Sequence, residues 1–115
     1  MTNSRRKGAD YEREVATMFK AKGLNARRGQ QYSGANGDPD VIVEDLPGYH
    51  LELKRRARTI SATEMYQFIG QSADDAREGE VPVVIHRVDG EKSLVTMRLD
   101  DWINMAKRAK EGTHE

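Results

Sequence analysis

The segment from Gly37 to Lys54 constrains the fold more than any other part of the chain. It reads as two short apolar strands joined by a turn at Pro47-Gly48, with carboxylates on the positions that the apolar residues leave open. In the second strand, an acid and a lysine occupy alternate positions. Because successive strand side chains point to opposite faces, they are expected side by side on one face. The alternation sets Tyr49, Leu51 and Leu53 against His50, Glu52 and Lys54.

A second acid, Asp40, stands at the entrance of the first of these strands. Pro39 fixes its own φ and restricts the residue before it, so the backbone at this entrance is held still. Two acids and a lysine that converge at a sheet edge are typical of a divalent-metal phosphodiesterase site. Asp38, which precedes Pro39, is an additional acid that could ligate in place of Asp40.

The expected ion is Mg²⁺, which takes a near-octahedral oxygen shell at about 2.0–2.1 Å. Asp40, Glu52, the backbone carbonyl of Leu53 and water would supply that shell. Lys54, on the Glu52 face, could orient the attacking water and offset charge that develops on the phosphate. His50 shares that face and could contact a water at the ion. The plain alternative is a surface hairpin with an outward Glu-Lys pair, which is the commoner meaning of an isolated Glu-x-Lys.

The chain has 115 residues, enough for one domain with a real core, and it contains no cysteine. Disulfides, thiolate zinc sites and cysteine nucleophiles are therefore excluded, and a reducing cytoplasm is expected. No apolar run approaches the roughly 20 residues that span a bilayer, and no signal peptide is visible. We expect a single domain over residues 1–115, with a basic arm at 1–8, a flexible tail at 111–115 and no membrane partner.

The formal net charge is zero, but the charge is unevenly distributed along the chain. Residues 1–60 carry 12 Lys/Arg against 8 Asp/Glu, whereas residues 61–115 carry 7 against 11. A single charge cluster is often only a solvated face, but three basic clusters flank the carboxylates and favour a nucleic-acid partner. The clusters comprise Arg5, Arg6 and Lys7; Arg27 and Arg28; and Lys54, Arg55, Arg56 and Arg58.

Hydrophobic periodicity and breakers predict an element order of α-β-β-β-α-β, followed by an added strand and helix. This order indicates an α/β fold with a mixed central sheet. Ser61 or Thr63 is expected to cap the second helix, with Glu64 completing a capping box if the cap is Ser61, and Gln67 and Gln71 are expected on the outer face of the helix. The predicted helices cover 9–22, 61–78 and 100–110, and the predicted strands cover 24–31, 40–44, 49–54, 81–87 and 94–99. A loop is expected at 30–37 and a basic linker at 55–60.

The apolar stripe of the first helix, Tyr11, Val15, Met18 and Phe19, selects one of its acids. At 100° per residue the stripe centres near Val15, with Glu12 roughly 50° away and Glu14 roughly 110° away. Glu12 should therefore border the buried face, whereas Glu14 should look out to water. In the last helix, Trp102, Ile103 and Ala106 are expected to face inward.

These residues resemble those of the PD-(D/E)xK nuclease superfamily. The motif is Pro39-Asp40 followed by Glu52-Leu53-Lys54, and the predicted order is similar to that superfamily's αβββαβ, restriction-endonuclease-like core. The opening, Arg6-Lys7-Gly8-Ala9 followed by Tyr11-Glu12-Arg13-Glu14, resembles archaeal-type Holliday junction resolvases and their phage relatives. The resemblance covers roughly residues 5–99.

The resemblance implies a role for each matching position. Asp40 and Glu52 would be metal ligands, Glu12 the helix acid that helps to hold metal or water, and Lys54 the catalytic lysine. Mg²⁺ would be the cofactor, with Mn²⁺ as a substitute. The arm at Arg5-Arg6-Lys7 would contact the DNA backbone, and the loop with Ser33 would reach toward the junction.

The function that we expect is therefore a Mg²⁺-dependent, structure-selective DNA endonuclease that resolves four-way junctions in recombination and repair. The resemblance implies a homodimer whose two sites cut opposed strands. We expect it to act in the cytoplasm of a bacterial or archaeal host cell, and its similarity to phage proteins is compatible with a virus-encoded protein. Two alternatives stay open: a related nuclease for flaps, nicks or general duplex DNA, and a DNA-binding module without activity.

Overall fold

The computed structural model describes residues 4–30 and 38–112. Ser33 and most of the predicted loop at 30–37 lie outside the described residues. None of the helices within the described ranges combines the length and the apolar character that crossing a membrane requires.

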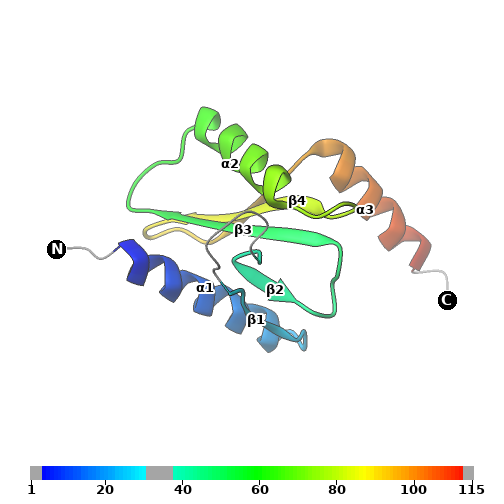
Figure 1. Cartoon of the computed structure of the whole chain (residues 1–115), viewed down its shortest axis with the longest axis horizontal. Helices are drawn as coiled ribbons and strands as arrows, with labels where there is room; N and C mark the ends of the chain where they lie inside the picture. Colours follow the sequence, from blue (N-terminus) through cyan, green and yellow to red (C-terminus); the bar gives the residue numbers. More distant parts are fainter. Residues whose placement is uncertain (1–3, 31–37, 113–115) are drawn as a thin grey trace.

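Within the described residues, three helices and five strands follow the predicted order (Figure 1). The helices are α1 (Ser4–Ala21), α2 (Ala62–Asp75) and α3 (Leu99–Gly112). The strands are β1 (Ala26–Arg28), β2 (Val41–Val43), β3 (Tyr49–Arg56), β4 (Val81–Val88) and β5 (Leu94–Met97).

The strands form one mixed sheet in the order β1-β2-β3-β4-β5. β3 and β4 are parallel and pair along their whole length, from Tyr49 opposite Val81 to Arg56 opposite Val88. The other neighbouring pairs are antiparallel. The crossover through α2 explains the parallel pair, because parallel strands need a long connection that carries the chain from the end of the first strand back to the level at which that strand began.

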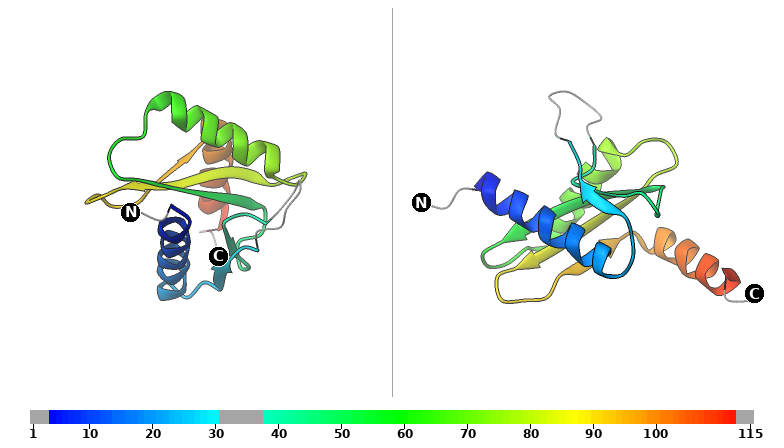
Figure 2. Two further views of the ribbon diagram at one scale, coloured as in Figure 1. Left: turned by 60° about the vertical axis from the view of Figure 1, so that its left-hand side comes forward. Right: turned by 90° about the horizontal axis from the view of Figure 1, so that it is seen from below.

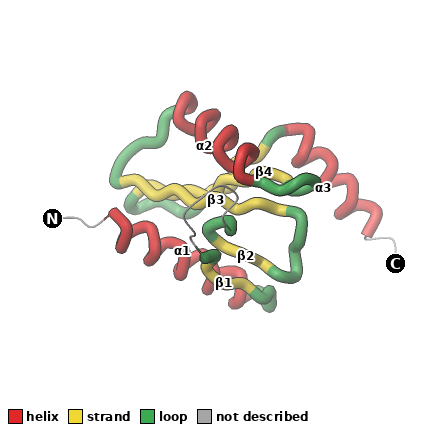
Figure 3. Tube along the Cα trace, viewed as in Figure 1, coloured by secondary structure: helices red, strands yellow, loops and turns green. Residues whose placement is uncertain are grey.

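Helices α1 and α2 cover opposite faces of the sheet (Figures 2 and 3). The face under α1 carries the larger core, in which Tyr11 and Val15 pack with Leu51, Leu53 and other strand residues. The face under α2 carries a smaller core of Phe68, Ile69 and Val84. The predicted alternation in β3 is confirmed, since its odd-numbered residues face α1 and its even-numbered residues, with the carboxylate and the lysine, face α2.

The start of α2 follows from its sequence. The Ser61 hydroxyl accepts a hydrogen bond from the Glu64 N–H, and the Glu64 carboxylate accepts one from the Ser61 N–H, both at 3.1 Å. The predicted capping box is thus confirmed. Gln67 and Gln71 are exposed, as expected from the helical periodicity. The helix ends at Asp75 rather than Glu78, because the Ala76 backbone turns extended.

Helix α1 starts earlier than its apolar stripe suggests. It begins at Ser4, so residues 4–8, which we expected in a basic arm, form its first turns. Met18, expected in the stripe, is exposed. β1 is also shorter than expected, with three residues instead of the predicted eight.

The strand boundaries also shift. β2 begins one residue after Asp40 and ends before Glu44, whereas β3 runs two residues beyond Lys54. Arg55 and Arg56 therefore lie in a strand rather than in a linker, because parallel pairing with β4 gives them hydrogen-bonding partners as far as Val88. β5 ends at Met97, two residues earlier than predicted.

Helix α3 does not pack as expected. Trp102 and Ile103 were predicted to face inward, but they are 51% and 48% exposed, and α3 contributes no buried residue. Figure 2 shows the helix projecting away from the sheet. Its amphipathic pattern is real, but both faces of the sheet already carry a helix. The helix also continues to Gly112, past the predicted start of the tail at Glu111.

The capping box yields a test of how α2 is held. Ser61→Ala removes the acceptor for the Glu64 N–H, and we expect the free energy of unfolding to fall by about 1 kcal/mol in urea titrations. Ser61→Asp, which keeps a capping oxygen, is the matched control and should stay close to the wild type. An alanine variant as stable as the wild type would show that the cap is not needed to hold α2.

Candidate active site

The candidate site lies where β2 and β3 diverge. The two strands pair at Val41 and Leu51, and the Asp40 N–H donates to the Leu51 carbonyl at 3.0 Å. Toward the C-terminal end of β3, no residue of β2 lies opposite, because the antiparallel β2 begins at Val41 whereas β3 continues to Arg56. The Asp40 carboxylate takes over as partner, because its Oδ2 accepts a hydrogen bond from the Leu53 N–H at 2.8 Å. Asp40 is thereby fixed against the open edge of β3.

The same geometry directs the Leu53 carbonyl. A residue in a strand presents its N–H and its C=O to the same neighbouring strand. Since the Leu53 N–H bonds to Asp40, the Leu53 carbonyl faces the same edge. The backbone oxygen that the sequence proposed as a ligand thus lies on the Asp40 side of β3.

Glu52 and Lys54 lie on the α2 side of this edge. The Glu52 side chain is 12% exposed, and its Oε2 is 3.9 Å from the Lys54 Nζ. The Lys54 ammonium also lies 4.9 Å from the centre of the Phe68 ring of α2. This cation–π contact restricts the lysine to the neighbourhood of the carboxylates.

Electrostatics join the carboxylates into one group. The pKa of Asp40 rises to about 6, first because burial penalises its charged form and then because the Glu52 carboxylate is near. The Glu12 carboxylate raises it further, while the hydrogen bond from Leu53 and the charge of Lys54 lower it. The charges of Glu12 on α1, Asp40 before β2, and Glu52 and Lys54 on β3 therefore interact with one another.

Glu12 and Glu14 behave differently from each other. The Glu12 side chain is 14% exposed and its Oε1 accepts a hydrogen bond from the Arg28 Nε at 2.9 Å. It borders the buried face as predicted. Glu14 was expected to look out to water, but it is only 39% exposed and pairs with Arg87 of β4 at 3.0 Å. A helical wheel correctly places Glu14 outside the apolar stripe, but it cannot show that Arg87 of β4 lies opposite Glu14 in the folded protein.

Asp38, the alternative ligand, is engaged elsewhere. Its Oδ2 accepts a hydrogen bond from the Gln30 N–H at 3.1 Å, and its Oδ1 lies 3.9 Å from Arg77. These contacts tie the backbone on either side of residues 31–37 together. Asp40, rather than Asp38, is the acid that reaches β3.

The donor set suits a hard divalent cation. Three carboxylates lie close enough to raise the pKa of one of them, and a backbone carbonyl faces the same edge. Oxygen-rich sites with an excess of negative charge are those that Mg²⁺ and Mn²⁺ bind. The residues present thus fit the ion that the sequence implied.

The basic residues divide into two groups. A cavity of about 480 Å³ opens beside the Leu53-Lys54 backbone and is lined by Lys7, Gly8, Arg55, Arg56 and Ala57. Within it, Lys7 and Arg55 share Asp89, at 3.5 and 3.2 Å, an acid that sequence reasoning did not single out. Asp89 belongs to the Asp89-Gly90 turn that follows β4. The turn lies near Lys7 and Arg55 because the end of β4 lies beside the end of β3.

The remaining basic residues lie outside that cavity. Arg27 pairs with Glu44 at 3.3 Å, and Arg28 is turned to Glu12. Arg5, Arg6 and Arg58 are exposed, and Ser33 lies outside the described residues. The structure thus brings Lys7, Arg55 and Arg56 to the candidate site together with Lys54, and places Arg27 on the outer face of β1.

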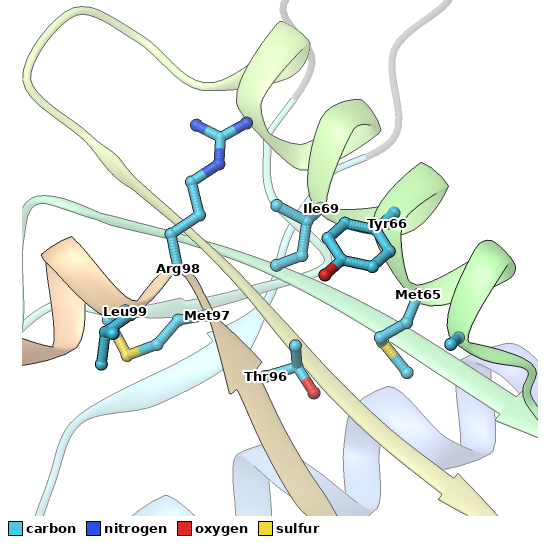
Figure 4. Close-up of a pocket in the computed structure, with 8 residues that line it drawn as sticks. Met65, Tyr66, Ile69, Thr96, Met97, Arg98 and Leu99 are labelled. Carbon is cyan, nitrogen blue, oxygen red and sulfur yellow. The ribbon is translucent and has the colours of Figure 1, made fainter.

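A second cavity, of about 500 Å³, lies between α2 and the junction of β5 and α3 (Figure 4). Its lining is mostly apolar, with Met65, Ile69, Met97 and Leu99 among its residues, and contains no carboxylate. Its polar groups are the hydroxyls of Tyr66 and Thr96 and the guanidinium of Arg98. It therefore lacks the oxygen-rich, negatively charged lining that the edge of β3 has.

Comparison with solved structures identifies the fold. The protein is similar to Hjc, a Holliday junction resolvase from the archaeal hyperthermophile Archaeoglobus fulgidus, with a TM-score of 0.52 and 20% sequence identity. The likeness covers 79% of this chain and 72% of that one. The mixed five-stranded sheet between helices is accordingly a restriction-endonuclease-like fold. No curated protein sequence matches this chain.

The sequence also matches a family model over residues 3–114. The family is described as "Phage putative PDDEXK endonuclease". This range includes all of the carboxylates discussed above and every helix and strand of the described residues. The chain therefore belongs to this phage PD-(D/E)xK endonuclease family.

Proposed function

We propose that the protein is a metal-dependent, structure-selective DNA endonuclease that resolves four-way junctions by paired cuts as a homodimer. The observation that carries the proposal is the joint placement of Asp40, Glu52, Glu12 and Lys54 at an open strand edge beside a basic cavity. Membership of a PD-(D/E)xK family supports nuclease chemistry, and the fold likeness to a Holliday junction resolvase favours the branched substrate.

In this proposal each residue of the group has a separate task. Asp40 and Glu52 would hold the divalent ion with the Leu53 carbonyl, and Glu12 would add negative charge from α1 or hold a water. The ion supplies Lewis-acid polarisation of the scissile phosphate and activation of water. Lys54, kept in place by the Phe68 ring, orients the attacking water and neutralises charge that develops on the phosphate oxygens.

The basic cavity would hold the DNA backbone next to these groups. Lys7, Arg55 and Arg56 lie within it, and Arg56 is restrained by the Phe68 ring at 5.4 Å. Contacts of Lys and Arg with phosphates give affinity without reading sequence, which suits recognition of DNA shape. Asp89 competes for two of these cations and would release them when phosphates arrive. The exposed Arg5, Arg6 and Arg58, together with Arg27, Arg28 and Ser33, complete the proposed DNA surface.

The dimer follows from the proposed reaction. Resolution of a junction requires two cuts on opposed strands, and one chain offers one such group of carboxylates among its described residues. We infer a homodimer acting on DNA in the host cytoplasm. The other candidate, a PD-(D/E)xK nuclease for flaps, nicks or duplex, has the same carboxylate group and differs only in the accepted DNA shape, so cleavage assays separate the two.

Substitution of the proposed site residues should slow cleavage strongly without unfolding the protein. We expect Asp40→Asn and Lys54→Ala to slow cleavage of labelled four-way junctions in Mg²⁺ by about 100-fold or more, because the first removes a charge that would hold the ion and the second removes a charge that would stabilise the transition state. Glu12→Gln should cause a smaller loss. The matched control for Glu12 is Asp10→Asn, an exposed acid on the same helix that pairs with Arg13, which should cut like the wild type.

Loss of activity in Asp10→Asn equal to that in Glu12→Gln would remove Glu12 from the site. No cleavage of any DNA by the wild type, with Mg²⁺ or with Mn²⁺, would contradict the nuclease proposal and leave the DNA-binding module.

The form of the DNA product tests junction resolution. We expect paired, symmetric nicks across the crossover of a four-way junction, with slower cutting of flaps and plain duplex, and a solution mass of two chains. Equal cutting of plain duplex would contradict junction selectivity. A monomeric mass with and without DNA would contradict the paired-cut mechanism.

The raised pKa of Asp40 predicts how metal and pH act together on stability. Without divalent metal, the folded state keeps a proton on Asp40 between the ordinary pKa of 3.8 and about 6, which the unfolded state does not. The free energy of unfolding should therefore fall as the pH rises through this window, by up to about 3 kcal/mol. Asp40→Asn should lack this component, so the difference between wild type and variant isolates it in urea titrations at pH 4.5 and 7.5.

Addition of Mg²⁺ at pH 7.5 should restore the lost stability of the wild type, because the ion binds the ionised carboxylates. It should raise the midpoint of the variant less. If the two proteins show the same dependence of the free energy of unfolding on pH in the absence of metal, the pKa of Asp40 is not raised in the folded state.

A further inference from the structure

The two oxygens of the Glu52 carboxylate contact different neighbours. Oε2 lies 3.9 Å from the Lys54 Nζ, whereas Oε1 lies 3.6 Å from the Nε2 of His50. His50 is only 2% exposed, under α2. Its ring nitrogens approach carboxylate oxygens at 3.6 and 3.9 Å, both longer than a hydrogen bond. The imidazole thus lies between two carboxylates, at distances just beyond those of hydrogen bonds.

A third side chain completes this group from α2. One ligand atom from each of His50, Glu52 and Asp75 lies within 4.8 Å of the other two. Two atoms bound at about 2.1 Å to one ion are at most about 4.2 Å apart, so small rotations would bring all three onto a single cation. The position of Asp75 is not accidental. The Ser72 hydroxyl donates to the His50 carbonyl at 3.1 Å, and Asp75 follows three residues later on the same helix face.

A fourth side chain lies beside the other ring nitrogen of His50. Glu80 Oε1 lies 3.9 Å from the His50 Nδ1 and is itself held by a 2.7 Å hydrogen bond from the Arg77 N–H. A carboxylate beside Nδ1 favours the tautomer with its proton there, which leaves the lone pair of Nε2 directed at Glu52. Histidine ligands of metal ions are usually held by such an outer carboxylate.

We propose that His50, Glu52 and Asp75 bind a divalent transition-metal ion, Zn²⁺ or Mn²⁺, separate from the ion at Asp40. An imidazole with two carboxylates suits these metals rather than Mg²⁺, which prefers oxygen ligands alone. Asp75 is the last residue of α2, where the helix dipole disfavours an acid and favours a cation. The ion would tie α2 to β3 and hold Glu52 Oε1, so that Oε2 stays turned toward Lys54. The site does not depend on nuclease activity.

Metal binding by the full chain tests the proposal in an Asp40→Asn background, which disables the other site. After removal of metal with a chelator, equilibrium dialysis against Zn²⁺ and against Mn²⁺ should give one bound ion per chain. Asp75→Asn and His50→Gln should each weaken binding at least about tenfold. The matched control is Asp74→Asn, an exposed acid one residue away on α2, which should bind like the parent. Mg²⁺ at the same concentration should not compete.

Two further readouts keep the test independent of activity and of folding. Zn²⁺ should shift the Nε2 resonance of His50 in ¹⁵N NMR of the ring and should raise the thermal midpoint of the parent but not of Asp75→Asn. If His50→Gln fails to fold, Asp75→Asn decides, because its side chain is only half-buried. No bound Zn²⁺ or Mn²⁺ in the parent, or binding that is unchanged in both ligand variants, would overturn the proposal. Either result leaves the nuclease proposal standing, because that depends on cleavage with Mg²⁺.

Discussion

The hydrogen bond between the Asp40 carboxylate and the Leu53 N–H is the interaction on which the candidate site depends. It forms because β2 starts at Val41 while β3 continues beyond it, so that β3 presents an unpaired backbone edge. The Asp40 carboxylate accepts the hydrogen bond that a strand carbonyl would otherwise accept, and it brings a negative charge to this edge. This satisfies a buried backbone donor and at the same time fixes a carboxylate beside Glu52. The cost appears in the raised pKa of Asp40, which burial and neighbouring acids both produce.

The sheet edge would not suffice without the two helices that cover it. α1 brings Glu12 to the edge from one face, and α2 brings Phe68 against Lys54 from the other. The hydrogen bond from Ser72 to the His50 carbonyl holds α2 in register with β3. Glu52 is therefore positioned by contacts on both of its oxygens, which is the arrangement that a precisely oriented ligand requires.

Much of the positive charge in the first half of the chain is paired within the protein. Arg28 meets Glu12, Arg27 meets Glu44, and Asp89 lies between Lys7 and Arg55. A zero net charge thus coexists with a local basic cavity beside the carboxylates, because the acids that balance it are distributed over other elements. Ion pairs of this kind are weak at exposed positions, so DNA phosphates could replace them at little cost.

The sequence by itself determined the element order, the face alternation of β3 and the capping box of α2, and it led to the proposal of Asp40, Glu52, Lys54 and Glu12 as site residues. These depend on local periodicity, on capping residues and on a short motif. It could not determine that α3 would lie exposed, that Glu14 would meet Arg87, or that Asp75 would come to His50. Those outcomes depend on which strands become neighbours and on the fact that α1 and α2 already cover the two faces of the sheet. Such contacts join residues as far apart as Glu14 and Arg87, and a local pattern carries no information about them.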